Sequence, residues 1–221
     1  MNQPLAIVEV RVLGSLIEKQ LTTPDYYPLT LNSLTTACNQ KNNRDPVTTF
    51  NETTVVRALD LLREKKLVST VTGTGIRVQK YKHNLDEVFS LNRQETTLLC
   101  LLMLRGPQTI GELRGRSGPM YQFPTAEEAE TVLAGLVGRE NQPLVQKLPR
   151  MTGQKETRYI HMLAGAPNLT ESDLAPPPEP ARLQVITENE RIEKLEELVS
   201  TLRTEIDNLQ QKFSEFKKQF E

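Results

Sequence analysis

The stretch NETTVVRALDLLREKKLV, residues 51–68, predicts a helix that runs into a β-strand. Asn51 is a typical N-cap residue, and the apolar residues after it recur with the spacing of one helical face. These inward positions are Val55, Ala58, Leu59 and Leu62. The β-prone runs LVSTV and IRVQKY follow, joined by TGTG. Two such runs around a glycine-containing segment indicate a β-hairpin directly after the helix.

Two more helices are predicted before residue 51. The first has apolar residues at helical spacing, and the prolines of TTPDYYPL interrupt the chain after it. Its apolar positions are Ile7, Val10, Leu13, Leu16 and Ile17. Thr30 can cap the second helix, in which Leu31, Leu34 and Cys38 share one side. Three helices followed by a hairpin form the order of a winged helix, which we expect over residues 1–85.

Residues 86–165 repeat this order with little residue identity. A strongly apolar helix from Asn92 to Leu104 precedes the short helix TIGELRGR and the helix TAEEAETVLAGLVG. The runs LVQKL and TRYIHM then supply two hairpin strands. Such internal repetition predicts a second winged helix over this range. Because each half is small for an independent domain, we expect the two halves to share an interface.

The C-terminal part has a different composition. Four prolines between positions 176 and 180 predict a stiff, extended linker over residues 166–184. Residues 185–221 follow a heptad pattern, which predicts a coiled-coil helix and a homodimer. The expected dimer contacts are Ile192, Leu195, Val199, Leu202, Ile206, Leu209, Phe213 and Phe216. A helix folded back onto the body is the alternative. The predicted fold class is α+β, mainly α.

Hydrogen-bond donors and positive charge are concentrated around the helix that begins at Asn51. The whole chain has a net charge of −1, but residues 41–82 contain nine basic and four acidic residues. Amides, hydroxyls and guanidinium groups bind phosphates and base edges, and helix-turn-helix proteins present the start of this helix to the major groove. The candidate DNA-contacting residues are Lys41, Asn43, Arg44, Asn51, Thr53, Thr54, Arg57, Arg63, Arg77 and Lys80.

Two alternatives remain for these features. The donors of residues 41–44 could belong to a long Asn-rich turn, with the exposed side of the following helix merely solvated. In the second half, the corresponding helix begins with the carboxylates Glu127, Glu128 and Glu130, which would repel phosphate. We therefore expect the second half to pack against the first or to bind another protein.

The residue pattern predicts no catalytic site, no metal site and no membrane-spanning segment. The chain has two cysteines and two histidines, and Cys38 and Cys100 are not spaced as metal ligands. Neither His83 nor His161 has a nucleophile or acidic partner placed by the sequence, so we predict no enzyme, catalytic residue, metal or cofactor. Without a signal peptide or a run of about 18 apolar residues, a cytoplasmic protein is expected.

Two resemblances support the winged-helix prediction. The run TTVVRALDLLREKKLV resembles the recognition helix and following strand of many bacterial winged-helix regulators. The stretch RVLGSLIEKQLTTPDYYPLTLNSLTTACNQKNNRDPV resembles the signature of the YceH-like family of uncharacterised bacterial proteins, over roughly residues 5–165. This resemblance implies a tandem winged-helix architecture, with DNA binding expected from the fold, and it implies no catalytic residues.

Two functional hypotheses follow. The first is a dimeric DNA-binding protein, for example a transcriptional regulator, which reads double-stranded DNA through the Asn51 helix and the first hairpin. The second is a non-enzymatic scaffold whose winged helices and coiled coil bind other proteins. The basic segment 41–82 favours DNA, and the acidic helix start in the second half favours a protein partner. The target sequence, an effector and the regulated pathway are not predictable from these residues.

Overall fold

A computed structural model describes residues 3–72, 78–140, 142–149 and 156–165. The chain divides into two units, Met1–Leu174 and Ala175–Glu221. All of the second unit lies outside the described residues, and so do the predicted linker and every heptad position. Within the described residues the architecture is α+β, with seven α-helices and two three-stranded antiparallel sheets.

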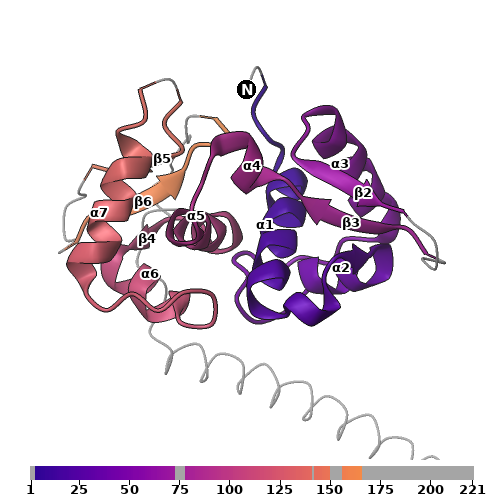
Figure 1. The fold of residues 1–221 in the computed structure, drawn as a ribbon, viewed down its shortest axis with the longest axis horizontal. Coiled ribbons are helices and arrows are strands. Elements are labelled where there is room, and N and C mark those ends of the chain that lie inside the picture. Colours follow the sequence, from indigo (N-terminus) through magenta and orange to yellow (C-terminus); the bar gives the residue numbers. More distant parts are fainter. Residues whose placement is uncertain (1–2, 73–77, 141, 150–155, 166–221) are drawn as a thin grey trace, which may run out of the picture. The chain divides into compact units, whose positions relative to one another are not determined.

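The first half contains three main helices and one small sheet (Figure 1). Its elements are α1 (Ile7–Thr22), the 3₁₀ turn η1 (Pro24–Tyr26), β1 (Leu29–Thr30), α2 (Leu31–Cys38), α3 (Glu52–Glu64), β2 (Val68–Val71) and β3 (Lys80–His83). The strand order is β1-β3-β2, with all pairs antiparallel. The three helices and the strand β2 therefore lie where the sequence predicts them, whereas β3 shares only Lys80 and Tyr81 with the predicted run IRVQKY and the two-residue strand β1 was not predicted.

The second half repeats the same order of elements. After the short helix α4 (Leu85–Phe89) come α5 (Arg93–Arg105), β4 (Gln108–Thr109), α6 (Ile110–Ser117), α7 (Ala126–Val137), β5 (Val145–Lys147) and β6 (Arg158–His161). The strand order β4-β6-β5 (Figure 1) matches that of the first sheet. The predicted caps Thr30 and Asn51 are present, and Asn92, which was predicted as the start of its helix, also acts as a cap: each side chain accepts a hydrogen bond from a backbone N–H in the first turn.

The two halves correspond residue by residue at their sheets. Thr30 pairs with Lys80 in the first sheet, and Thr109 pairs with Arg158 in the second. Each threonine also caps the helix that follows it, α2 or α6. PLTL at 28–31 thus matches PQTI at 107–110, and KYKH at 80–83 matches RYIH at 158–161. Because the two halves share this framework, side chains at equivalent positions can be compared directly.

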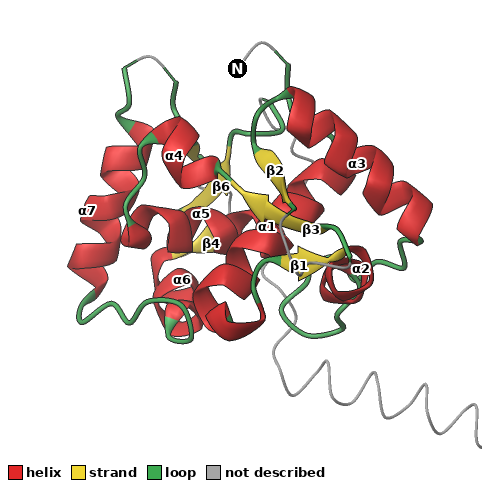
Figure 2. Ribbon diagram, turned by 45° about the vertical axis from the view of Figure 1, so that its right-hand side comes forward, coloured by secondary structure: helices red, strands yellow, loops and turns green. Residues whose placement is uncertain are grey.

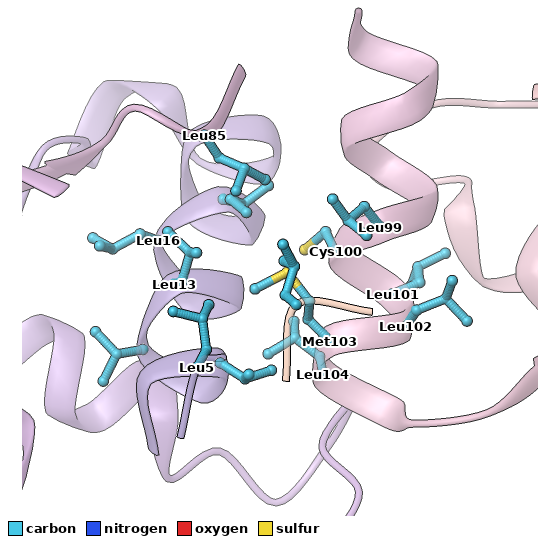
Figure 3. Close-up of a cluster of buried hydrophobic side chains, with 14 of the residues drawn as sticks. Leu5, Leu13, Leu16, Leu85, Leu99, Cys100, Leu101, Leu102, Met103 and Leu104 are labelled. Atoms are coloured by element: carbon cyan, nitrogen blue, oxygen red, sulfur yellow. The ribbon is translucent and has the colours of Figure 1, made fainter. Parts of the chain in front are cut away.

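One hydrophobic core runs through both halves, because α1 packs against α5. Figure 3 shows Leu13 and Leu16 of α1 and Cys100, Met103 and Leu104 of α5 as parts of one cluster of buried side chains. The contact is close at Gly14, where an added Cβ would lie 2.9 Å from Leu104 Cδ2. Helix α1 is buried along most of its length, and its buried residues include Glu9, Arg11 and Glu18 as well as apolar ones.

Candidate nucleic-acid interface

The start of α3 is exposed and its inward face is buried, as the sequence predicts. Val55, Ala58, Leu59 and Leu62 are the buried residues of this helix. Asn51 Oδ1 accepts hydrogen bonds from the backbone N–H and the hydroxyl of Thr54, both at 2.8 Å. Thr53 and Arg57 are exposed beside this cap. The positive end of the helix dipole therefore faces solvent together with a hydroxyl and a guanidinium group, and with the exposed Glu52 carboxylate of the first turn.

Asn39 positions the start of α3 relative to α2. Its Nδ2 donates to the Phe50 carbonyl at 2.7 Å, and its Oδ1 accepts from the Phe50 N–H at 2.8 Å. Asn39 follows the last residue of α2, and Phe50 directly precedes the Asn51 cap. This pair of hydrogen bonds resembles one rung of a sheet, and it connects the end of one helix to the beginning of the next.

Arg44 is buried, which corrects its place among the predicted DNA contacts. Its Nη1 and Nη2 donate to the two carboxylate oxygens of Glu18 at 3.0 and 2.6 Å. Its Nε and Nη2 also donate to the Ala37 carbonyl at 3.1 and 2.8 Å. The side chain has 0% exposure. Because the planar fork of a guanidinium satisfies a carboxylate and a helix-end carbonyl together, Arg44 ties the loop to α1 and α2.

The charge of Glu18 is maintained by this arrangement. Burial acts to raise the pKa of Glu18, but hydrogen bonding and charge from Arg44, with a contribution from Lys19, lower it overall. A second buried guanidinium supports the same loop: Arg11 donates to the Cys38 carbonyl at 3.3 Å and to the Pro46 carbonyl at 2.6 Å. The polar loop after α2 is therefore an ordered connection between helices, with much of its hydrogen bonding directed inward.

Two residues of this loop remain on the surface. Lys41 is exposed, and so is Asn43, which has a positive φ of 61°. Asn43 Oδ1 accepts a hydrogen bond from Arg105 of α5, and the Asp45 N–H donates to the Leu104 carbonyl at 2.9 Å. The loop thereby contacts the second half, and the side chain of Asn43 is partly engaged there.

The remaining predicted contacts lie on two other elements. Arg63 is exposed in the last turn of α3, 3.4 Å from Asp60, about three turns from the Asn51 cap. Lys80 lies on β3, partly exposed. Lys82, which the sequence analysis did not single out, shares the outward face of β3 with Lys80 because strand side chains alternate. Arg77 lies outside the described residues.

The second half presents a different surface at its equivalent helix. Thr125 caps α7, and Glu127 and Glu130 are exposed near this start. Hydrogen bonds from its own backbone N–H and from Thr125 lower the pKa of Glu127. Glu128 instead accepts from Gln94 at 2.6 Å and from Tyr121 at 3.1 Å. The start of α7 therefore carries several carboxylates and no guanidinium group, whereas the start of α3 exposes Arg57 together with the single carboxylate of Glu52.

No group of three or more His, Cys, Asp or Glu side chains in the part of the chain that the structure describes is arranged to hold a metal ion. No described helix is long and apolar enough to cross a membrane.

Comparison with known proteins identifies the family. Residues 5–154 match the family described as "Protein of unknown function, DUF480", and the chain belongs to this family. A UPF0502 protein from Geotalea uraniireducens is 54% identical over 221 residues, all of both chains. The UPF0502 protein of Geobacter sulfurreducens is 54% identical over 97% of each chain. One from Vibrio atlanticus is 42% identical over 95% of this chain and 96% of its own.

Proposed function

We propose that this chain is a DNA-binding protein built from two winged helices, of which the first reads double-stranded DNA. The observation that carries the proposal is the exposed start of α3, where Thr53 and Arg57 lie on the surface beside the Asn51 cap. The order α1, β1, α2, α3, β2, β3 and its exact repetition in the second half support winged helices. In this fold family the third helix enters the major groove.

The residues of the first half then have distinct roles. Thr53 and Arg57 lie at the groove-facing start of α3, with Asn51 and Thr54 forming its cap. Lys41, Lys80 and Lys82 supply ammonium groups for backbone phosphates, which position a protein without carrying sequence information. Arg44 and Asn39 act indirectly, because their hydrogen bonds hold the loop and the entry of α3.

The proposal extends to the remaining parts of the chain. The heptad residues from Ile192 to Phe216 form a coiled coil that makes a homodimer, so that two copies of α3 meet DNA together. The protein acts in the cytoplasm and performs no catalysis. A transcriptional regulator is the simplest function of this kind.

A scaffold is the second candidate function. The exposed Glu127 and Glu130 at the start of α7 favour it, because they oppose phosphate binding in the second half. In this account the winged helices bind other proteins, and the coiled coil sets their number. The two candidates differ in one respect that is easily measured, which is the affinity for duplex DNA.

The double variant Arg57→Ala, Arg63→Ala tests the proposed groove contact. Binding to duplex DNA should weaken, by about 1–3 kcal/mol if Arg57 contacts a base edge. Fluorescence anisotropy with a labelled duplex measures the change, and Lys147→Ala in the second half is the matched control, since Lys147 is exposed on β5. Unchanged affinity in the double variant would remove α3 from the interface.

A further inference from the structure

A surface hollow lies in the first half between the end of α1, the turn η1, helix α2 and strand β3. Its volume is about 640 Å³, which is within the range of small-molecule sites. Lysine, hydroxyl and aromatic side chains line it, among them Lys19, Tyr26, Thr30, Ser33 and Lys80. Figure 2 shows β1 and β3 running beside α2 in this region. The proposed role of α3 uses none of these residues except Lys80.

The equivalent position in the second half is occupied by a carboxylate of the chain itself. Glu112, in the first turn of α6, accepts a hydrogen bond from Arg158 of β6 at 3.1 Å. The same Glu112 oxygen accepts from the Thr109 N–H at 2.9 Å. Arg158 is the strand partner of Thr109, as Lys80 is of Thr30. A carboxylate thus lies between the strand cation and the start of the helix.

Two sequence differences between the halves leave this position in the first half without a carboxylate. The alignment of PLTLNSLTTA with PQTIGELRGR matches Ser33 to Glu112 and Ala37 to Arg116. In the second half, Arg116 lies 3.6 Å from Glu112. The first half therefore lacks both the carboxylate and its second guanidinium partner, and the smaller Ser33 and Ala37 line the hollow instead. Among the described residues, Lys80 forms no ion pair.

We propose that this hollow binds a small organic anion, whose anionic group takes the place that Glu112 fills in the second half. The Lys80 ammonium and the Ser33 hydroxyl, which accepts a hydrogen bond from the Thr30 hydroxyl at 3.0 Å, would hold a carboxylate or a phosphate monoester. Tyr26, which is 79% exposed, offers an aromatic surface to the apolar body of the ligand.

The charges around the hollow determine the orientation of the ligand. Lys19 at the α1 side is already occupied, since its Nζ lies 3.2 Å from Glu18 and donates to Gln40 at 3.2 Å. Asp25 in η1 repels an anion from the Tyr26 side. The anionic group therefore binds at Lys80, and an aromatic ring attached to it extends toward Tyr26.

Ligand-observed NMR and isothermal titration of the full-length chain test this proposal. The probes are benzoate and phenyl phosphate, with neutral benzamide as the ligand control. At least one anion should bind saturably, and benzamide at least tenfold more weakly. Lys80→Ala should weaken binding at least tenfold, whereas Lys82→Ala should leave it unchanged, because Lys82 lies on the same strand face but does not line the hollow.

The decisive variant is Ser33→Glu, which supplies the first half with the carboxylate of the second. It should abolish anion binding while thermal unfolding shows an intact fold. Equal anion binding in Ser33→Glu and the parent, equal binding of benzamide, or no binding of either anion would overturn the proposal. If neither anion binds but Lys80→Ala and Ser33→Glu weaken duplex binding, Lys80 contacts a DNA phosphate and the small-anion site is rejected. The proposal does not rest on DNA binding, which Arg57 tests separately.

Discussion

At the residue scale, the buried ion pair between Arg44 and Glu18 connects the loop after α2 to α1. An arginine that follows four amide side chains and one lysine predicts a surface contact, because arginine is seldom fully buried without a partner. Its partner, Glu18, is 26 residues earlier, and nothing in the local pattern connects the two. Burial of a charge depends on which elements pack together, so sequence reasoning could place Lys41 and Arg57 on the surface but not predict that Arg44 is inside.

Removing one member of this pair should be costly. Arg44→Leu leaves Glu18 buried without its guanidinium, and we expect the free energy of unfolding to fall by about 3–5 kcal/mol. Urea denaturation measures the loss. The double variant Glu18→Leu, Arg44→Leu should recover much of it, and Arg63→Ala, at an exposed pair, should cost under about 1 kcal/mol. A loss below about 1 kcal/mol for Arg44→Leu would show that the pair contributes little to stability.

The buried side chain of His83 is expected to make the free energy of unfolding fall in acid. Burial, opposed in part by Asp86, lowers its pKa from 6.5 to about 4, and its Nδ1 accepts the Leu85 N–H at 3.3 Å. Because the unfolded chain takes up this proton at a higher pH than the folded chain, stability is complete above pH 6.5 and falls toward pH 4. The shift corresponds to about 3 kcal/mol.

A comparison of variants isolates this contribution from that of the carboxylates. The parent and His83→Gln are unfolded in urea at pH 7 and at pH 4. The decrease in unfolding free energy between the two pH values should be smaller in His83→Gln by about 3 kcal/mol. Part of the pH dependence should persist, since burial also lowers the pKa of His161 to about 4. Equal decreases in both proteins would mean that His83 titrates normally in the folded state.

At the element scale, the capped and strongly periodic helices could be predicted from the sequence, and the shortest elements could not. Asn51 and Thr30 cap helices as expected, because a cap and a 3.6-residue period are local signals. The two-residue strands β1 and β4 have no period to detect, and their pairing depends on β3 and β6. The matching registers of the two sheets, and hence the hollow at Lys80, could likewise not be predicted from the sequence, because they depend on which strands pair.

Because α1 packs closely against α5 at Gly14, a larger side chain at this position should destabilise the protein. A Cβ there would lie 2.9 Å from Leu104 Cδ2 and 3.3 Å from Met103 Cβ. Gly14→Val should lower the free energy of unfolding by about 1–3 kcal/mol, because the tightly packed interface must move apart. Thermal unfolding followed by circular dichroism gives the change. Gly115→Ala in α6 is the matched control, since nothing lies within 4 Å of its added Cβ.

The control is expected to change stability in the opposite direction. Alanine has the higher helix propensity, so Gly115→Ala should stabilise the protein by up to about 1 kcal/mol. If Gly14→Val left the free energy of unfolding unchanged, the two helices would have space between them. The continuous core of the two halves would then not be close-packed at this point.

At the scale of the whole molecule, two halves with the same framework carry different surfaces. The start of α3 exposes Arg57, and the start of α7 exposes Glu127 and Glu130. The common core of α1 and α5 holds both halves in one compact unit. A chain of this kind can use one half for nucleic acid while the other half supports it or binds a protein. The proposed dimer would double the DNA-binding surface.

The affinity of the full-length protein for duplex DNA at two salt concentrations tests the central claim most directly. Anisotropy of a labelled random-sequence duplex at 50 and 200 mM salt gives the two dissociation constants. If α3 and the lysines around it bind DNA, the protein binds at low salt and log K falls with log salt by about 0.9 per phosphate contact. Absence of binding at 50 mM salt, or an affinity that does not change with salt, would contradict the DNA-binding account and favour the scaffold.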